Sequence, residues 1–147
     1  MDKKLKISLG SDHAGVEYKV KIIDLLTSLG VECKDFGPLS TESVDYPDYI
    51  HPVATSVENK EYDLGIVLCG SGNGAAITAN KHQGIRCGLV WTPELAELTR
   101  LHNDANMISI PARFISLETA LEIVKVFIST QFEGGRHQLR VDKIACK

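Results

Sequence analysis

Cys69 stands where an apolar run meets a glycine-rich turn, in the sequence CGSGNGA. Gly70, Gly72 and Gly74 permit a tight turn with inward-pointing amides, and the positive end of a following helix dipole would add to an anion-binding nest. A thiol beside such a nest favours its reactive thiolate form. The alternative is that Cys69 is a small buried hydrophobe and the glycines only form a turn. From this stretch alone, both interpretations stay open.

Three known loop signatures fit this stretch poorly. A Walker A loop, G-x-x-x-x-G-K-[ST], is absent, and a cysteine phosphatase loop would need an arginine where the chain has Ala75. Gly70, Gly72 and Ala75 match the dinucleotide pattern G-x-G-x-x-G/A, but after the third predicted strand and not the first. A noncatalytic nucleotide-binding module therefore remains an alternative.

The candidate imidazole and guanidinium groups lie in three other places. His13 follows Asp12 at a strand-to-helix junction, and His102 lies near a predicted helix end, where an imidazole could transfer protons near neutral pH. Arg136 and Arg140 stand four apart, which on a helix forms a phosphate clamp. Each has a structural alternative. Asp12 could only cap a helix, His102 could only interact with the helix dipole, and the two arginines could only form a solvated basic helix face.

The elements that must position these groups are short β-type runs alternating with helix-period segments. The runs are LKISLG, VECKDF, LGIVLC, CGLVW and NMISI. This alternation predicts an α/β fold with a doubly wound, parallel, five-stranded sheet, in a single domain over residues 1–147. Ligands of such sheets lie beyond the carboxyl ends of the strands. We therefore expect Asp12, His13, Cys69 and Ser71 to share one rim, with His102 as a further candidate.

Helix boundaries are signalled by caps. A first helix is expected over residues 16–29, with Gly30 as its stop, and another from Pro93 to about residue 101, capped by Thr92. Ser116 is expected to cap a further helix, and a final C-terminal helix follows EGGR. ESVDYPDY is predicted to be a loop in which Tyr46 offers a wall or a hydroxyl group.

Composition and charge argue against a membrane, secreted, metal-binding or nucleic-acid-binding protein. No run approaches the ~20 apolar residues of a membrane span, and MDKKLKISLG lacks the apolar core of a signal peptide, so a cytoplasmic location is expected. The four cysteines form no C-x-x-C pair, and no metal site is predicted. A formal charge of −3 gives no general attraction to nucleic acid, and the basic tail better suits a small anion.

Six motifs together, in order along nearly the whole chain, resemble the ribose-5-phosphate isomerase B family, which includes galactose- and allose-6-phosphate isomerases. They are GSDHAG, ESVDYPDY, CGSGNG with ANK, GIRC, HNDAN and GGRHQLR. The resemblance implies a Rossmann-like fold and aldose-ketose isomerisation through an enediolate, without metal or cofactor. It also implies a homodimer with active sites between the subunits.

Residue roles follow from this resemblance. Cys69 corresponds to the base that moves a proton between C2 and C1, Ser71 to part of an oxyanion hole, and His102 to the residue that opens the sugar ring. The substrate-binding residues implied are Asp12, His13, Tyr46, Gly70, Gly72, Asn73, Gly74, Asn103, Arg113, Arg136 and Arg140. Among these, His13 and the three arginines match positions around the phosphate, some reaching in from the partner chain.

One branch of the family places a glutamate base just after GNG, where this chain has Ala75 and Ala76. No carboxylate is available there, so Cys69 is the base that the loop can offer. Asn73 resembles the glutamate branch, whereas Cys69 resembles the cysteine branch. We expect ribose 5-phosphate as the substrate, with a hexose 6-phosphate as the alternative.

Overall fold

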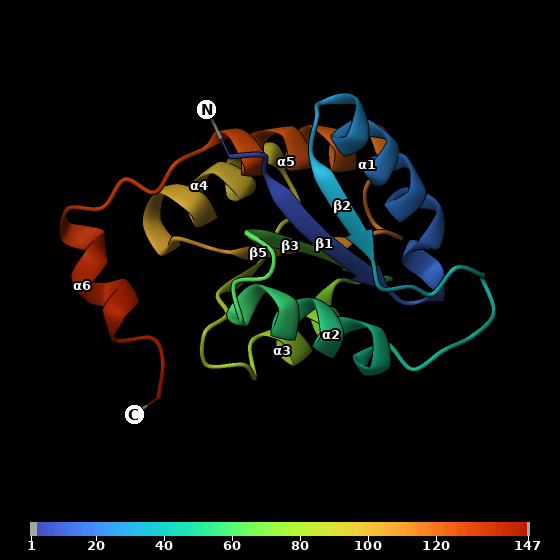
Figure 1. Ribbon diagram of the computed structural model, residues 1–147, viewed down its shortest axis with the longest axis horizontal. Helices are drawn as coiled ribbons and strands as arrows, with labels where there is room; N and C mark the ends of the chain where they lie inside the picture. Colours follow the sequence, from blue (N-terminus) through green and yellow to red (C-terminus); the bar gives the residue numbers. More distant parts are fainter. Residues whose placement is uncertain (1–2, 147) are drawn as a thin grey trace.

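The computed structural model describes residues 3–146, in which strands and helices alternate (Figure 1). The strands are β1 (Lys6–Ser11), β2 (Glu32–Asp35), β3 (Leu64–Cys69), β4 (Cys87–Leu89) and β5 (Met107–Pro111). The helices are η1 (His13–Gly15, a 3-10 turn), α1 (Val16–Ser28), α2 (Pro47–Glu58), α3 (Asn73–Ala79), α4 (Pro93–Asn103), α5 (Leu117–Ser129) and α6 (Arg136–Asp142). Within residues 3–146, no helix has the length and apolar character to cross a bilayer.

The five strands form one parallel sheet in the order β2-β1-β3-β5-β4, which confirms the predicted architecture. From β1 the chain moves to β2 on one side and then crosses to β3 on the other side of β1. The strand order therefore reverses between β1 and β3. Open α/β sheets bind their ligands at such a switch point, beyond the carboxyl ends of the strands.

Helices cover both faces of the sheet (Figure 1). Helices α1, α4 and α5 lie on one face, and α2 and α3 on the other. Side chains of β3 alternate between the two cores: Ile66 and Leu68 pack toward α1 and α5, whereas Val67 and Cys69 pack among residues of α2 and α3. Burial on both faces explains why the strand is a nearly continuous apolar run.

The predicted caps are confirmed. Gly30 has φ 83° just after α1, in the left-handed conformation that glycine adopts at low cost. The Thr92 hydroxyl accepts a hydrogen bond from the Leu95 amide (3.2 Å), and the Ser116 hydroxyl caps α5 in the same way. Helix α4 continues to Asn103, two residues beyond its predicted end, and stops at Asp104 with φ 48°.

The prediction of a loop over ESVDYPDY is wrong from Pro47 onward, because α2 begins there. Proline is well suited to the first helical position, where its missing N–H would have no partner and its fixed φ is already helical. Ile50 and Val53 then pack fully buried against the sheet. The proline therefore starts a helix, and the loop ends at Tyr46.

Helix α6 stands apart from the rest of the fold, beside α4 (Figure 1). His137 and Val141 are its buried residues, whereas Leu139 is 64% exposed. Gly134 and Gly135 precede it with positive φ values, which lets the chain turn sharply after the α5 layer. The C-terminal helix was predicted, and its position beside α4 was not.

Candidate active site

Asp12 follows β1 directly at the switch point. Its amide donates a hydrogen bond to the carbonyl of Leu68 (3.0 Å), which ties the end of β1 to the end of β3. Its carboxylate Oδ1 accepts from the Gly15 amide (3.1 Å), so Asp12 caps η1 as one interpretation of the sequence expected. The cap fixes the carboxylate at the edge of the sheet beside the end of β3.

His13 is held by the loop that precedes α2. Its Nδ1 accepts a hydrogen bond from the Val44 amide at 3.3 Å. A neutral imidazole that accepts at Nδ1 carries its proton on Nε2, which leaves that nitrogen as a donor. The long-range contact therefore sets the orientation of the His13 ring.

Tyr46 covers the start of α3. A Cβ placed on Gly74 would lie 2.5 Å from Cζ of the Tyr46 ring and 2.8 Å from its hydroxyl oxygen. No side chain other than hydrogen fits at Gly74 while the ring keeps this position. Close approach, and not a positive φ, is the reason for this glycine.

Cys69 is the last residue of β3 and is 5% exposed. Gly72 turns the chain with φ 77°, and its carbonyl accepts a hydrogen bond from the Ser109 hydroxyl (2.7 Å). The Ser71 Oγ accepts bonds from the amide (3.3 Å) and side chain (3.2 Å) of Asn73. The turn is thereby fixed from both ends, and the Ser71 hydroxyl proton stays free to point elsewhere.

Arg113 lies over the same turn. Its amide donates to the carbonyl of Gly70 (3.0 Å), and a Cβ on Gly70 would lie 3.3 Å from the Arg113 Cδ. The guanidinium group is thus placed beside the glycine turn. We call this group of residues the carboxyl rim: Asp12, His13, Tyr46, Cys69, Gly70, Ser71, Gly72, Asn73, Gly74 and Arg113.

The remaining predicted site residues form a second group together with Glu133 and His137, which were not predicted. This group is here called the α6 cluster: His102, Asn103, Glu133, Arg136, His137 and Arg140. Five of these six line a cavity of about 330 Å³ together with Val141 and Ile144. The rings of His102 and His137 stack with centroids 4.4 Å apart and an angle of 19° between their planes. Burial lowers the pKa of His137 most, and the nearby His102 and Arg136 lower it further.

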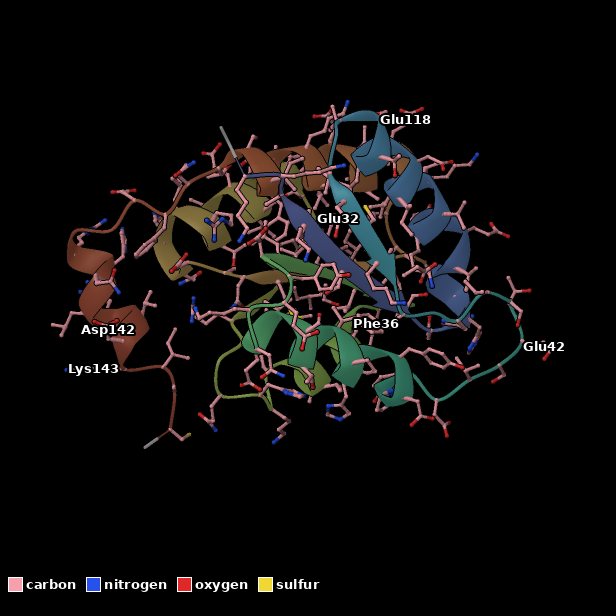
Figure 2. The ribbon with its side chains drawn as sticks, in the orientation of Figure 1. Glu32, Phe36, Glu42, Glu118, Asp142 and Lys143 are labelled. Carbon is pink, nitrogen blue, oxygen red and sulfur yellow. The ribbon has the colours of Figure 1, made fainter. Side chains whose placement is uncertain are left out.

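The carboxyl rim and the α6 cluster lie at opposite edges of the sheet. Helix α4 leaves the carboxyl end of β4 and returns to the start of β5, so its last turn, with His102, lies at the amino edge. The length of β5 alone corresponds to about 15 Å. Figure 2 shows the same separation: Asp142 on α6 and Glu42, in the loop before Tyr46, lie at opposite ends of the molecule. The expectation that His102 could share the rim with Asp12 is therefore wrong within one chain.

Two residues of the α6 cluster were missed as site residues. Glu133 and His137 are four positions apart, with Glu133 Oε1 3.9 Å from His137 Nε2. Their four-residue spacing is visible in the sequence, whereas the stacking of His137 on His102 exists only in the folded chain. A larger cavity of about 530 Å³ lies beside α2, between Phe36, His51 and Glu61, and contains no predicted site residue.

Comparison with known proteins places this geometry in context. A family model described as ribose/galactose isomerase matches residues 7–144. The ribose-5-phosphate isomerase B of Escherichia coli is 45% identical over 139 residues, covering 95% of this chain and 93% of that protein.

Solved structures agree in fold. The ribose 5-phosphate isomerase of Thermotoga maritima superposes with a TM-score of 0.94 at 47% identity, covering 97% of this chain and 99% of that one. The ribose-5-phosphate isomerase B of Mycoplasma genitalium, solved with bound ribulose-5-phosphate, gives a TM-score of 0.93 at 38% identity, covering 97% and 95%.

Proposed function

This chain belongs to the ribose/galactose isomerase family, and we propose that it interconverts ribose 5-phosphate and ribulose 5-phosphate. The observation that carries the proposal is the meeting of Asp12, His13 and the Cys69 turn at the β1/β3 switch point. Support comes from relatives named for this activity that align over almost the whole chain, one of them holding ribulose-5-phosphate.

Cys69 is the proposed base. Its thiolate removes the proton from C2 of the open-chain aldose, and the electrons of the C–H bond form the C1–C2 double bond while O1 becomes an oxyanion. The thiol then returns the proton to C1, as the O2 proton moves to O1 and C2 becomes the ketone. Ala75 and Ala76 follow the turn. Because both are alanines, neither position offers a carboxylate that could compete with Cys69 as the base.

The glycine turn is the proposed oxyanion hole. Preorganised donors at the site of developing charge commonly supply several kcal/mol of transition-state stabilisation, about 2.7–4 kcal/mol for one donor. The proposed donors are the Ser71 hydroxyl and the amides of residues 70, 71, 72 and 74. The Asn73 amide already donates to Ser71 Oγ (3.3 Å) and fixes the turn instead. The tie between Ser109 and Gly72 keeps the turn rigid before substrate arrives.

Four residues of the α6 cluster supply the other half of the proposed site: His102, Asn103, Arg136 and Arg140. His102 would open the furanose ring by taking the proton of the C1 hydroxyl and returning one to the ring oxygen, with Asn103 holding the sugar. Arg136 and Arg140 would bind the phosphate together with His13 and Arg113. Because one chain holds the two groups at opposite edges of its sheet, we infer a homodimer in which each α6 cluster faces the carboxyl rim of the other copy.

The test is a comparison of kcat/KM for ribose 5-phosphate, allose 6-phosphate and galactose 6-phosphate with the purified chain. The pentose phosphate is expected to be the best substrate. A higher kcat/KM for either hexose phosphate would change the assigned substrate but leave the proposed isomerisation reaction unchanged. Thermal stabilisation by nucleotides with none by ribose 5-phosphate, and no turnover, would instead favour a nucleotide-binding module.

A further inference from the structure

Three side chains of types that can ligate a metal ion converge from separate segments in the α6 cluster. His102 comes from the last turn of α4, Glu133 from the connection between α5 and α6, and His137 from the first turn of α6. One ligand atom of each lies within 4.8 Å of the other two. Two imidazoles and a carboxylate are a common donor set for zinc, which in catalytic and inhibitory sites keeps a further position for water.

His137 carries an unmet requirement that such an ion would satisfy. The residue is 8% exposed, yet its Nε2 is buried without a hydrogen-bond partner among the described residues. The nearest acid, Glu133, is 3.9 Å away, which is too far for a hydrogen bond. Buried polar atoms rarely stay unpaired, because each loses its solvation without compensation. A cation between these two groups would ligate both.

A second pair of histidines offers a contrast. His51 Nδ1 and His82 Nε2 lie 2.7 Å apart, and His82 Nδ1 is 3.3 Å from Glu58 Oε1. These facing nitrogens already have partners, so an ion would have to break hydrogen bonds to bind. His51 therefore provides a matched control for the zinc experiments.

We propose that His102, Glu133 and His137 bind a divalent transition-metal ion, Zn²⁺ in particular, and that this ion inhibits the chain. Zinc with N and O ligands at about 2.0–2.1 Å places neighbouring ligand atoms roughly 3.4 Å apart, so modest side-chain rotation is required. The stacked rings must open, and Glu133 must move inward. Glu133 can do so because its side chain is 53% exposed and Gly134 follows it.

Two arginines in the same cavity affect which ions can bind. Arg136 and Arg140 repel any cation, although one guanidinium nitrogen of Arg140 is turned back to the carbonyl of Arg136 (3.0 Å). An ion that gains little from imidazole, such as Mg²⁺ or Ca²⁺, would not overcome this repulsion. Zinc and copper bind imidazole strongly, so the site should discriminate in their favour.

The inhibitory consequence rests on the proposed function. A metal ion on His102 would occupy the lone pair needed to accept the C1 hydroxyl proton during ring opening. It would also displace the His102 ring from its stacked position on His137. Zinc should therefore lower the rate with ribose 5-phosphate, and a chelator should restore it.

Binding is tested first, without substrate, by calorimetric titration of the reduced full chain with Zn²⁺ alone in a non-chelating buffer. A Cys146→Ser background removes the exposed thiol. Glu133→Gln and His137→Asn should each weaken zinc binding by about tenfold or more. The control His51→Asn should leave it unchanged. The absorption spectrum with Co²⁺ should show nitrogen and oxygen ligation and no thiolate charge-transfer band.

Inhibition is tested on Glu133→Gln, because the Glu133 side chain is 53% exposed and has no role in the proposed reaction. This variant should retain isomerase activity and require at least about tenfold more zinc for inhibition. Unchanged zinc binding in both Glu133→Gln and His137→Asn, or loss of binding in His51→Asn, would overturn the site. Zinc binding that depends on the triad in a chain without isomerase activity would uphold the site and refute the proposed function.

Discussion

Cys69 and His102 lie at opposite edges of the same sheet, Cys69 at the end of β3 and His102 in the last turn of α4 before β5 begins. Cys69 and His102 of one chain therefore cannot both reach the same sugar molecule. If each site takes Cys69 from one copy and His102 from another, two inactive variants should complement each other. Mixing equal amounts of Cys69→Ala and His102→Ala chains under conditions of subunit exchange should restore about one quarter of wild-type activity. Failure of the exchanged mixture to regain activity would contradict the shared site.

Replacement of the proposed base should separate turnover from binding. Cys69→Ala removes the group proposed to move the proton between C2 and C1, so kcat should fall by about 10²–10⁴-fold or more, while ribose 5-phosphate still binds. Steady-state kinetics together with calorimetric titration would measure both. The control is Cys33→Ala, which replaces a half-buried cysteine of β2 and should keep kcat near the wild-type value. Near-normal turnover by Cys69→Ala would refute its role as the base.

Alkylation should distinguish Cys69 from the buried Cys87 and the half-buried Cys33. Burial raises the pKa of the Cys87 thiol far above its usual range and raises that of Cys33 as well, so both should react slowly. In a Cys146→Ser chain, iodoacetamide should modify Cys69 before either of them, in parallel with loss of activity. Mass spectrometry over a time course would follow each site, with ribose 5-phosphate slowing only the Cys69 reaction. Full alkylation of Cys69 without loss of activity would contradict its proposed role.

The contact between Tyr46 and Gly74 should be intolerant of a methyl group. Gly74→Ala gains up to about 1 kcal/mol of helix propensity, but overpacking against the ring costs about 1–3 kcal/mol, so a net loss of stability is expected. Urea denaturation would measure it. Adding Tyr46→Ala should relieve the loss. Gly70→Ala is the control, because its Cβ would meet only the flexible Arg113 side chain at 3.3 Å.

The carboxylate of Glu58 should make stability depend on pH in the acid range. The Gly84 amide donates to its Oε2 (2.7 Å), and this bond, followed by the contact with His82, lowers the pKa of Glu58 below its ordinary value of 4.5. The stabilisation is therefore present above pH 4.5 and is lost as the pH falls through the lowered, folded-state pKa. The free energy of unfolding should be measured for the wild type and for Glu58→Gln across this pH range. The difference between the two values should shrink as the pH falls. A difference that is independent of pH would contradict this account.

Local sequence patterns were sufficient to predict the parallel sheet and the meeting of Asp12 with the Cys69 turn at its carboxyl edge. Apolar runs of strand length alternating with capped helices require parallel strands, and parallel strands end at the same edge. Asp12 after β1 and Cys69 at the end of β3 therefore had to meet, whatever the details of packing. The caps at Thr92 and Ser116 were equally local, because each depends on a side chain reaching an amide three residues away.

The same topological rule could have placed His102 correctly. A helix between two parallel strands ends at the amino edge, so the proximity of HNDAN to the fifth strand already implied the opposite side from Cys69. The start of α2 was also readable, since Pro47 suits a first helical position better than the middle of a loop. Both errors came from local motifs considered without the path of the chain.

Only the tertiary structure decided which side chains meet across long separations. Tyr46 lies against Gly74 because the loop before α2 is held at Val44 by His13, a contact between residues 31 positions apart. His137 stacks on His102 because α6 leaves the α5 layer at two glycines with positive φ and returns beside α4. Hydrophobic periodicity determines which face of each element is buried, whereas the direction of an irregular segment depends on the packing of everything it crosses.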